Sequence, residues 1–214
     1  MGRLNRGPNG PFSGKAGSII GSSWRGIYYI KGLQKKITKA RSPLQIEQQQ
    51  RFALAVKFLC YVKPIVDMGF SNVNPRGATG YNMAISHMLQ HSIKGKHPDL
   101  EILYPSVVFA LGKLTLPENL KMEVNGLKLK LSWGTETDNY KSFKDDQVMI
   151  LIYRPKSFDY QFSDQEITRI QAETELELDS WHKDDTVHVY LYLVEKRGKR
   201  WSDSLYLGSV DVVG

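Results

Sequence analysis

The N-terminal forty-one residues constrain the fold of this chain more than any other segment. After Met1 they run GRLNRGPNGPFSGKAGSIIGSSWRGIYYIKGLQKKITKAR, with nine Lys or Arg residues and no Asp or Glu. Such a polar, glycine-rich stretch lacks the apolar content that a packed domain needs. Three aromatic residues, Trp24, Tyr28 and Tyr29, nevertheless gather near its end. We therefore expect residues 1–41 to form a basic arm that lies on another subunit, a nucleic acid or its own body.

Charge divides the chain into two parts. Residues 1–99 contain fifteen Lys or Arg and three acids, a net charge of +12, whereas residues 100–214 contain fourteen and nineteen, a net charge of −5. Opposite charges let the front of one molecule attract the back of another. The same physics would draw a nucleic acid to the basic half. Charge alone leaves both kinds of partner open.

The segment after the arm predicts two helices. Ser42 supplies a capping hydroxyl, and Pro43 suits the first helical position. The helical pattern continues to about Val62 and predicts an apolar stripe. The expected stripe consists of Leu44, Phe52, Val56, Leu59 and Val62. A second helix is expected over Thr79–Ile93, so residues 42–99 should form a helical hairpin.

The remainder of the chain changes to the alternating pattern of strands. The expected strands are Ser106–Leu116, Lys121–Trp133, Gln147–Tyr153, Ile167–Leu178, Val187–Val194 and Ser204–Val213. Alternation in LKLKLSW and TELEL is typical of a sheet with one face in water. Asn125-Gly126 and Arg197-Gly198 are turn signals, and Trp133 is expected to fill the core. Residues 100–214 therefore predict an antiparallel β-sandwich of immunoglobulin or fibronectin-III type, and the whole chain an α+β fold.

Several segments together resemble a bacterial family of uncharacterised proteins, catalogued as a domain of unknown function. The arm motif Gly-x-Phe-Ser-Gly-Lys-x-Gly is present as Pro11–Gly17, followed by Ile19–Gly21 and Trp24–Gly26. Arg51–Val56 and Ser204–Val210 carry the resemblance into the rest of the chain. Pro11 stands where the family pattern has a second glycine, which implies a different local turn. The resemblance supports the boundaries and implies no activity and no catalytic residues.

Motifs for phosphate or metal binding do not reach the required pattern. Gly10–Ala16 has three residues between its outer glycines and then Lys-Ala, whereas a phosphate loop needs four and then Lys-Ser or Lys-Thr. His87 and His91 share a helix face, but a third metal ligand would have to come from His97 or Asp99. We expect these histidines to be structural or solvated. The sequence thus predicts no metal and no cofactor.

Candidates for nucleophilic or acid–base catalysis are equally sparse. No Gly-x-Ser-x-Gly elbow occurs, and Cys60 lies in an apolar helical segment where a buried, structural thiol is expected. The acid pairs Asp145-Asp146 and Asp184-Asp185 are expected in solvated loops. We therefore expect a protein that is not an enzyme and has no small-molecule substrate.

The sequence also bears on the surroundings of the chain. A single cysteine excludes an intramolecular disulfide, and no apolar run approaches the ~20 residues that a membrane span needs. No secretory signal peptide is recognised. The expected location is the cytoplasm, with release by lysis or by a non-classical route left open.

The segment Trp24–Lys31 has three interpretations. It can be a strand that pairs within its own subunit, a strand that pairs with a neighbouring copy, or a platform on which nucleic-acid bases stack. Nearby isoleucines favour protein over a wet polyanion groove. These isoleucines are Ile19, Ile20, Ile27 and Ile30.

The favoured prediction is a structural protein whose copies assemble through the arm into a homo-oligomer, ring, tube or filament. The expected subunit-interface residues are Phe12, Ile19, Ile20, Trp24, Arg25, Tyr28, Tyr29 and Lys31. The first alternative is a nucleic-acid-binding protein that uses the basic half. A carbohydrate- or protein-binding module is the second, and a sugar platform would use Trp181 or Trp201.

Overall fold

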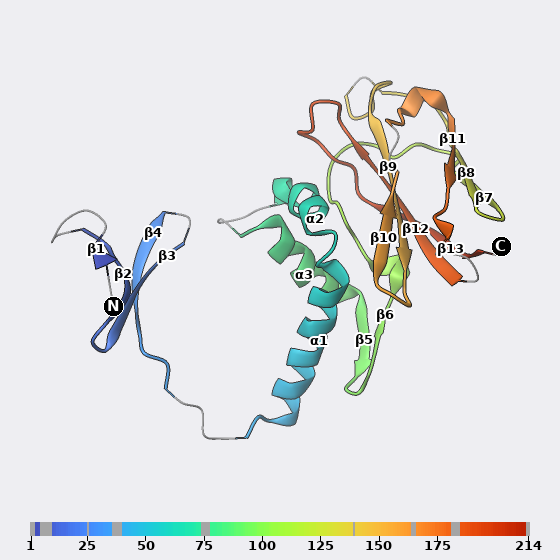
Figure 1. Ribbon diagram of the computed structural model, residues 1–214. Helices are drawn as coiled ribbons and strands as arrows, with labels where there is room; N and C mark the ends of the chain where they lie inside the picture. Colours follow the sequence, from blue (N-terminus) through green and yellow to red (C-terminus); the bar gives the residue numbers. More distant parts are fainter. Residues whose placement is uncertain are drawn as a thin grey trace. The chain divides into compact units, whose positions relative to one another are not determined.

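Figure 1 shows the computed structural model of the chain. The structure describes residues 3–4, 10–24, 26–35, 40–73, 78–138, 140–163, 166–180 and 185–212. The chain divides into two compact units, Met1–Arg41 and Ser42–Gly214. The division falls at the end of the expected arm. The helices and the strands after them belong to one unit.

The arm unit is a four-stranded antiparallel sheet. Its strands are β1 (Arg3–Leu4), β2 (Phe12–Ala16), β3 (Ile19–Trp24) and β4 (Ile27–Gly32), which pair in chain order. Gly17 and Gly26 have φ angles of +60° and +82° in the two-residue turns before β3 and β4, a conformation that suits glycine. A single strand over Trp24–Lys31 was expected, and this was wrong: the chain reverses at Gly26, so Trp24 pairs with Ile27.

The second unit begins with helix α1 (Pro43–Leu59) at the predicted residue. The Ser42 hydroxyl accepts the Gln45 backbone N–H at 3.3 Å, and the Gln45 side chain accepts the Ser42 N–H at 3.0 Å, a reciprocal cap. The predicted apolar stripe was partly wrong, because Leu44 and Phe52 are exposed. The buried stripe of the segment is Ala55, Phe58, Leu59 and Val62, which recur at three- and four-residue spacing.

Two shorter helices and a hairpin follow α1. Helix α2 (Lys63–Gly69) and the 3₁₀ turn η1 (Ser71–Val73) precede α3 (Gly80–His91), which Thr79 caps. The chain then forms a hairpin of β5 (Ile93–Lys96) and β6 (Asp99–Ile102). A boundary was expected at residue 99, yet this position lies within the hairpin. Arg51 of α1 ties the hairpin to the helix by donating to the carbonyls of Ile93 and Gly95.

Two antiparallel sheets make up the β-rich part. The small sheet has the order β11-β8-β7 and the large sheet the order β10-β9-β12-β13. Their bounds are β7 (Lys121–Asn125), β8 (Lys128–Ser132), β9 (Gln147–Arg154), β10 (Asp159–Phe162), β11 (Glu173–Glu177), β12 (Asp185–Val194) and β13 (Leu205–Val212). The 3₁₀ turns η2 (Tyr104–Ser106) and η3 (Arg169–Gln171) lie before β7 and β11. The structure is thus a mixed fold of helices and several antiparallel sheets.

The strand predictions differ from the structure in three places. Ile167–Leu178 was expected to be one strand, but Arg169–Gln171 form the turn η3 and only Glu173–Glu177 form β11. Ser106–Leu116 was expected to be a strand, but it is irregular apart from the bridge of Leu114 to Ser202. Its apolar residues, such as Val107 and Phe109, pack under the helices instead. Strand β10 was not predicted, because its four residues, DYQF, are too few to show alternation.

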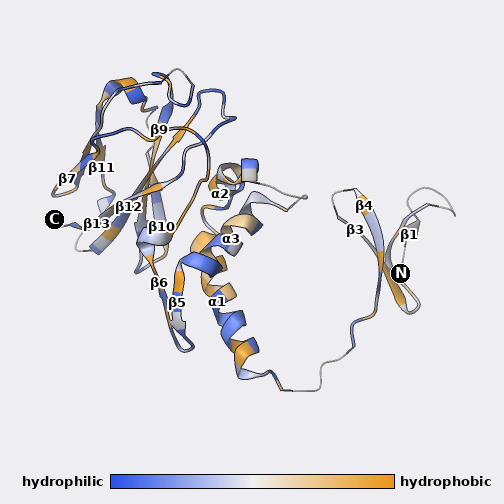
Figure 2. Ribbon diagram, turned by 180° about the vertical axis from the view of Figure 1, so that it is seen from behind, coloured by the Kyte–Doolittle hydropathy of each residue, from blue (hydrophilic) through white to orange (hydrophobic). Residues whose placement is uncertain are grey.

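The large sheet is covered on both faces. One face of β9 and β12 shares a core with the small sheet, and the other packs against the helices. Phe58 of α1, for example, meets Tyr153 of β9 edge to face, with ring centroids 4.7 Å apart. Figures 1 and 2 both show the helices on the side of the large sheet away from β7, β8 and β11. Burial on both faces explains the nearly continuous apolar sequence of β12.

Candidate functional site

The register of the arm sheet assigns its side chains to two faces. Residues directly opposite each other in paired strands point to the same face, and successive residues alternate. The first face carries Phe12, Ala16, Ile19, Tyr28 and Ile30, and the second carries Lys15, Ile20, Trp24, Ile27, Tyr29 and Lys31. Each face therefore has aromatic and aliphatic side chains, and both described lysines of the sheet lie on the second.

Most of these apolar side chains are exposed. The exposed members of the unit are Ile19, Trp24, Ile27, Tyr28, Tyr29, Ile30 and Leu33. Ile27 and Ile30, at 66% and 64% exposed, lie on opposite faces of β4. A sheet without a second layer cannot bury its two faces. Exposed apolar side chains on a sheet are a candidate interaction surface.

Phe12 occupies the space beside Gly21. The Phe12 ring lies where a Gly21 side chain would be, since a Cβ built on Gly21 falls 2.7 and 2.8 Å from two ring carbons. A pocket of about 260 Å³ borders Phe12. Its lining consists of Gly10, Pro11, Phe12, Tyr28, Tyr29 and Ile30. The pocket thus opens beside a ring that fills the place of a Gly21 side chain.

The expected interface residues lie together on this sheet but not on one surface. Seven of them divide between the two faces, and Arg25 lies outside the described residues. The sequence-based set omitted the two most exposed large apolar side chains of the described arm residues, Ile27 and Ile30. Reading β4 as a strand that begins at Ile27 would have found them, because its apolar residues then occupy both faces.

The glycine-rich segment Gly10–Ala16 has no phosphate-loop geometry. Its residues from Phe12 onward form β2, where Gly14 pairs with Gly21 of β3. A phosphate loop instead wraps its backbone N–H groups around an anion before a helix. These residues are therefore part of the sheet surface.

The two histidines of α3 are neighbours. The ring centroids of His87 and His91 are 4.6 Å apart, and burial together with the charge of His91 lowers the pKa of His87. Within the described ranges, no group of three or more potential ligands surrounds a metal position. Phe70 packs on His87, as expected for a ring at the edge of a core.

One expected loop acid is buried instead. Asp146 is 0% exposed, and its Oδ2 accepts the Phe143 backbone N–H at 2.8 Å and lies 3.6 Å from the guanidinium of Arg169. Burial raises the pKa of the Asp146 carboxyl, opposed by the Phe143 N–H and the Arg169 charge. The prediction of a solvated acid failed because Arg169, far off in sequence, could not be foreseen as its partner.

The second expected acid pair has a similar outcome. Asp185 is buried at the start of β12, where its carboxylate meets Arg154 at 2.9 Å and also Lys156. Asp184 lies outside the described residues. Asp185 therefore ties β12 to the end of β9.

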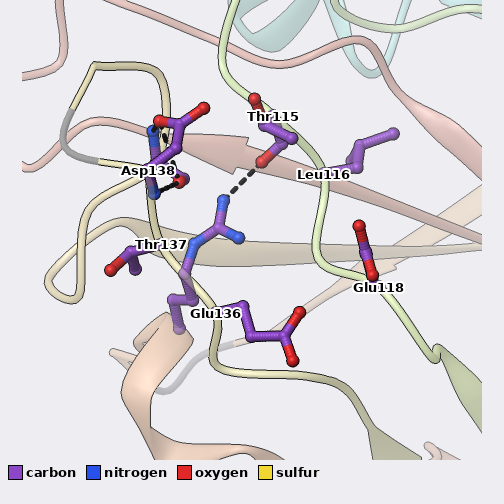
Figure 3. A pocket seen from close by; sticks show the side chains of 8 residues that line it. Thr115, Leu116, Glu118, Glu136, Thr137 and Asp138 are labelled. Carbon is purple, nitrogen blue, oxygen red and sulfur yellow. Dashed lines mark hydrogen bonds between the residues drawn. The ribbon is translucent and has the colours of Figure 1, made fainter.

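A small pocket opens beside Arg169. Its volume is about 210 Å³, and Figure 3 shows Glu118 and Glu136 among the side chains that line it. The Arg169 guanidinium donates to the Thr115 carbonyl, while Asp138 caps the adjoining loop by accepting the Lys141 N–H at 2.6 Å. These contacts join separate segments at one end of the β-rich part.

Cys60 and Trp201 also differ from expectation. The Cys60 thiol was expected to be buried but is exposed, because α1 turns Phe58 and Leu59 inward and the next residue outward. Trp201 is buried against Tyr192 and so offers no sugar platform. Trp181 lies outside the described residues.

None of the helices in the described ranges is long and apolar enough to cross a membrane. No curated protein matches the sequence. The model of the family described as Family of unknown function (DUF6266) matches residues 11–208, so the chain belongs to that family.

Proposed function

We propose that this protein is structural and self-assembling, and that the arm sheet of one copy docks on the Ser42–Gly214 unit of another. One observation carries the proposal: the arm sheet exposes isoleucine and tyrosine side chains on both faces, Ile27 on one and Ile30 on the other. Burying such a surface on association is favourable by roughly 25 cal/mol per Å² of apolar area. The protein is proposed to act by binding, with no catalytic role.

Charge favours the rest of a second copy over a second arm as the partner. Residues 1–41 contain nine basic residues and no acid, so two arms repel each other. Residues 100–214 carry a net charge of −5 and attract the arm. Docking of two different surfaces is heterologous, and repeating it closes a ring or extends a filament or tube.

We also propose that the two facing sheets form a sandwich of the immunoglobulin or fibronectin-III type. Support comes from the strand order: β7 and β8 lie in the small sheet, β9 and β10 in the large, β11 in the small, and β12 and β13 in the large. Crossing between three- and four-stranded sheets is a feature of these sandwiches. An experimental structure in which β11 left the β8 edge would contradict this assignment.

The assembly proposal is tested by the mass of the full-length protein. We expect the wild type to show multiples of 24.4 kDa by light scattering at about 100 μM, where a micromolar contact is saturated. The double variant Ile27→Thr, Ile30→Thr keeps β-branched residues but removes apolar area, and should be monomeric. Tyr61→Thr, which removes an exposed aromatic of the second unit, is the control and should assemble.

Two results would contradict the proposal. A wild-type mass of 24.4 kDa would mean that the arm does not join copies. Unchanged assembly of the double variant would mean that another surface joins them.

Nucleic-acid binding is the second candidate function. It is favoured by the exposed Tyr29, which shares the second face with Lys15 and Lys31. Bases would stack on the ring while the lysines neutralise phosphates. The affinity for a single-stranded oligonucleotide should then fall with salt, by a slope of about −0.7 per phosphate neutralised. Lys15→Gln with Lys31→Gln should reduce that slope, and absent binding at about 50 mM salt would remove this candidate.

A further inference from the structure

Among the described residues of the arm sheet, β4 is the longer of the two edge strands. The strand order places β1 and β4 at the edges, and β1 is only two residues long. β4 has six residues, all exposed, pairs with β3 without a register shift, and contains no proline. Lys31 is the one charged residue of this edge strand, and an edge strand without proline or a bulge is a template for another strand. The outer backbone N–H and C=O groups of β4 can therefore bond a partner strand, in addition to the contacts that its side chains make.

Among the described residues of the Ser42–Gly214 unit, the small and large sheets together have four edge strands. In the large sheet, β13 has a register shift opposite Val189 and Tyr190, and a bulge of this kind disfavours further pairing. The other edge, β10, has only four residues. The small sheet leaves β7 and β11, which have five residues each.

The two remaining strands differ in charge. β11 exposes three glutamates at alternate positions, Glu173, Glu175 and Glu177, and has no basic residue. β7 instead exposes Lys121 and Glu123, which cancel. Opposite charges on neighbouring strands stabilise a pair, and the arm has only basic ones.

We propose that β4 of one copy adds to the β11 edge of the next copy and extends its small sheet by β-augmentation. This inference rests on the proposed function and names the acceptor surface. Lys31 lies on the same face of β4 as Ile27 and Tyr29, so placing it beside the glutamates puts Tyr28 and Ile30 on the inner side. There they continue the row of Leu176, which points into the core.

Contacts already present around β11 are compatible with an added strand. Glu173 and Glu175 pair across the sheet with Lys130 at 3.0 Å and Lys128 at 2.8 Å, on the inner neighbour β8. Glu177 enters no ion pair with any described residue. Gln161 of β10 donates to the Glu177 carbonyl at 2.8 Å, so the added strand would pair with the part of β11 before it.

Cysteine cross-linking tests this pairing directly. In a Cys60→Ser chain, Lys31→Cys is combined in turn with Glu173→Cys or Glu175→Cys, and the protein is oxidised mildly. Directly opposed residues in paired strands lie within disulfide reach. We expect at least one pair to give a ladder of cross-linked chains on a non-reducing gel, and that pair identifies the register. Lys31→Cys with Glu123→Cys, on the other edge of the same sheet, is the matched control and should stay monomeric.

Charge removal gives a second test that does not depend on register. The triple variant Glu173→Gln, Glu175→Gln, Glu177→Gln should weaken association between copies by about tenfold or more at low salt. The control Glu118→Gln, Glu123→Gln, Glu136→Gln changes the net charge equally at exposed sites off β11, and should associate as the wild type does. Urea unfolding of both variants confirms that the second unit is folded.

The outcomes separate this inference from the assembly proposal. Assembly that needs Ile27 and Ile30 but gives no cross-link to β11, or gives it equally with the β7 control, overturns the β11 pairing alone. Cross-links within one chain instead of between chains would overturn it too, since they place the arm on its own body. Cross-linked ladders with β11 only, together with loss of association in the first triple variant, support it.

Discussion

The indole N–H of Trp133 donates a 2.8 Å hydrogen bond to the backbone carbonyl of Arg169. Trp133 follows β8, and Arg169 begins the turn η3 that leads into β11, so the bond joins two neighbouring strands of the small sheet at one end. The indole is buried, as the sequence predicted. A buried N–H needs a partner, and here the ring fills the core while its polar atom is satisfied.

Replacing this indole should destabilise the protein. We expect Trp133→Phe to lower the free energy of unfolding by about 1–3 kcal/mol, because the ring shrinks and the Arg169 carbonyl loses its donor. Urea unfolding followed by circular dichroism measures the change. Tyr140→Phe, at a ring that is 83% exposed, should change it by less than about 0.5 kcal/mol. Equal effects of the two substitutions would show that the Trp133 indole and its hydrogen bond add nothing to stability.

Removing one partner of the Asp146–Arg169 ion pair should lower the free energy of unfolding strongly. Asp146→Ala leaves the Arg169 guanidinium, 1% exposed, without its carboxylate, and we expect a loss of about 3–5 kcal/mol. The double variant Asp146→Leu, Arg169→Met should lose less than the sum of the two single changes, since it leaves no unpaired charge. Additive losses in a double-mutant cycle would contradict a direct interaction.

Local pattern predicted the helix start and most of the strands, whereas distant partners could not be predicted. Ser42 and Gln45 lie three residues apart, so their reciprocal cap is visible in the sequence. The burial of Asp146 depends on Arg169, which lies more than twenty residues away and shares no pattern with it. The arm was expected to lack packed structure because its composition is polar, yet it forms a four-stranded sheet in which Gly14 pairs with Gly21. The expected interface residues were chosen by composition, and their division between two faces needed the turn at Gly26.

Acid should weaken the fold through His188. Burial lowers the pKa of this imidazole, which stacks on Tyr104 and has its Nδ1 2.9 Å from the Tyr206 hydroxyl, with Tyr153 beyond. The unfolded chain takes up a proton near pH 6.5 while the folded chain resists it, so stability is full above that pH and falls below it.

Urea midpoints measured at several pH values check this dependence. Between about pH 7.5 and pH 5.5 the wild-type midpoint should fall, and His188→Gln should flatten part of the decrease. His87, whose pKa is also lowered, contributes the same sign, so His87→Gln is the comparison. A wild-type midpoint that rises on acidification would reverse the sign and contradict this account.

Gly21 should be required for the arm sheet and not for the rest of the protein. A Cβ at this position collides with the Phe12 carbonyl and ring, whereas one at Gly32 in β4 meets nothing within 4 Å. We expect Gly21→Ala to reduce assembly while leaving the unfolding of the Ser42–Gly214 unit unchanged, and Gly32→Ala to assemble normally. Light scattering and urea unfolding of both variants provide the comparison. A normal mass for Gly21→Ala would show that the ring moves aside at little cost.

The Cys60 thiol should react in the folded protein. It is exposed at the end of α1, so a thiol reagent in native buffer should modify it within about tenfold of the rate for an unfolded cysteine at the same pH. Absorbance of the released thiolate follows the reaction. Protection by a factor of about a thousand would show that the residue lies in an interface between copies or in the core.

The double covering of β9 and β12 has a consequence for anyone who divides this chain. The helices occupy one side of these strands and the small sheet the other, so neither layer can be removed without stripping a face that Phe58 or Leu129 now covers. We therefore expect Ser42–Val212 to fold cooperatively as one piece. A cut near residue 99 would separate two halves of one core. Fusion tags and chimeric exchanges therefore belong at the junction of Arg41 and Ser42, where the two compact units meet in the sequence.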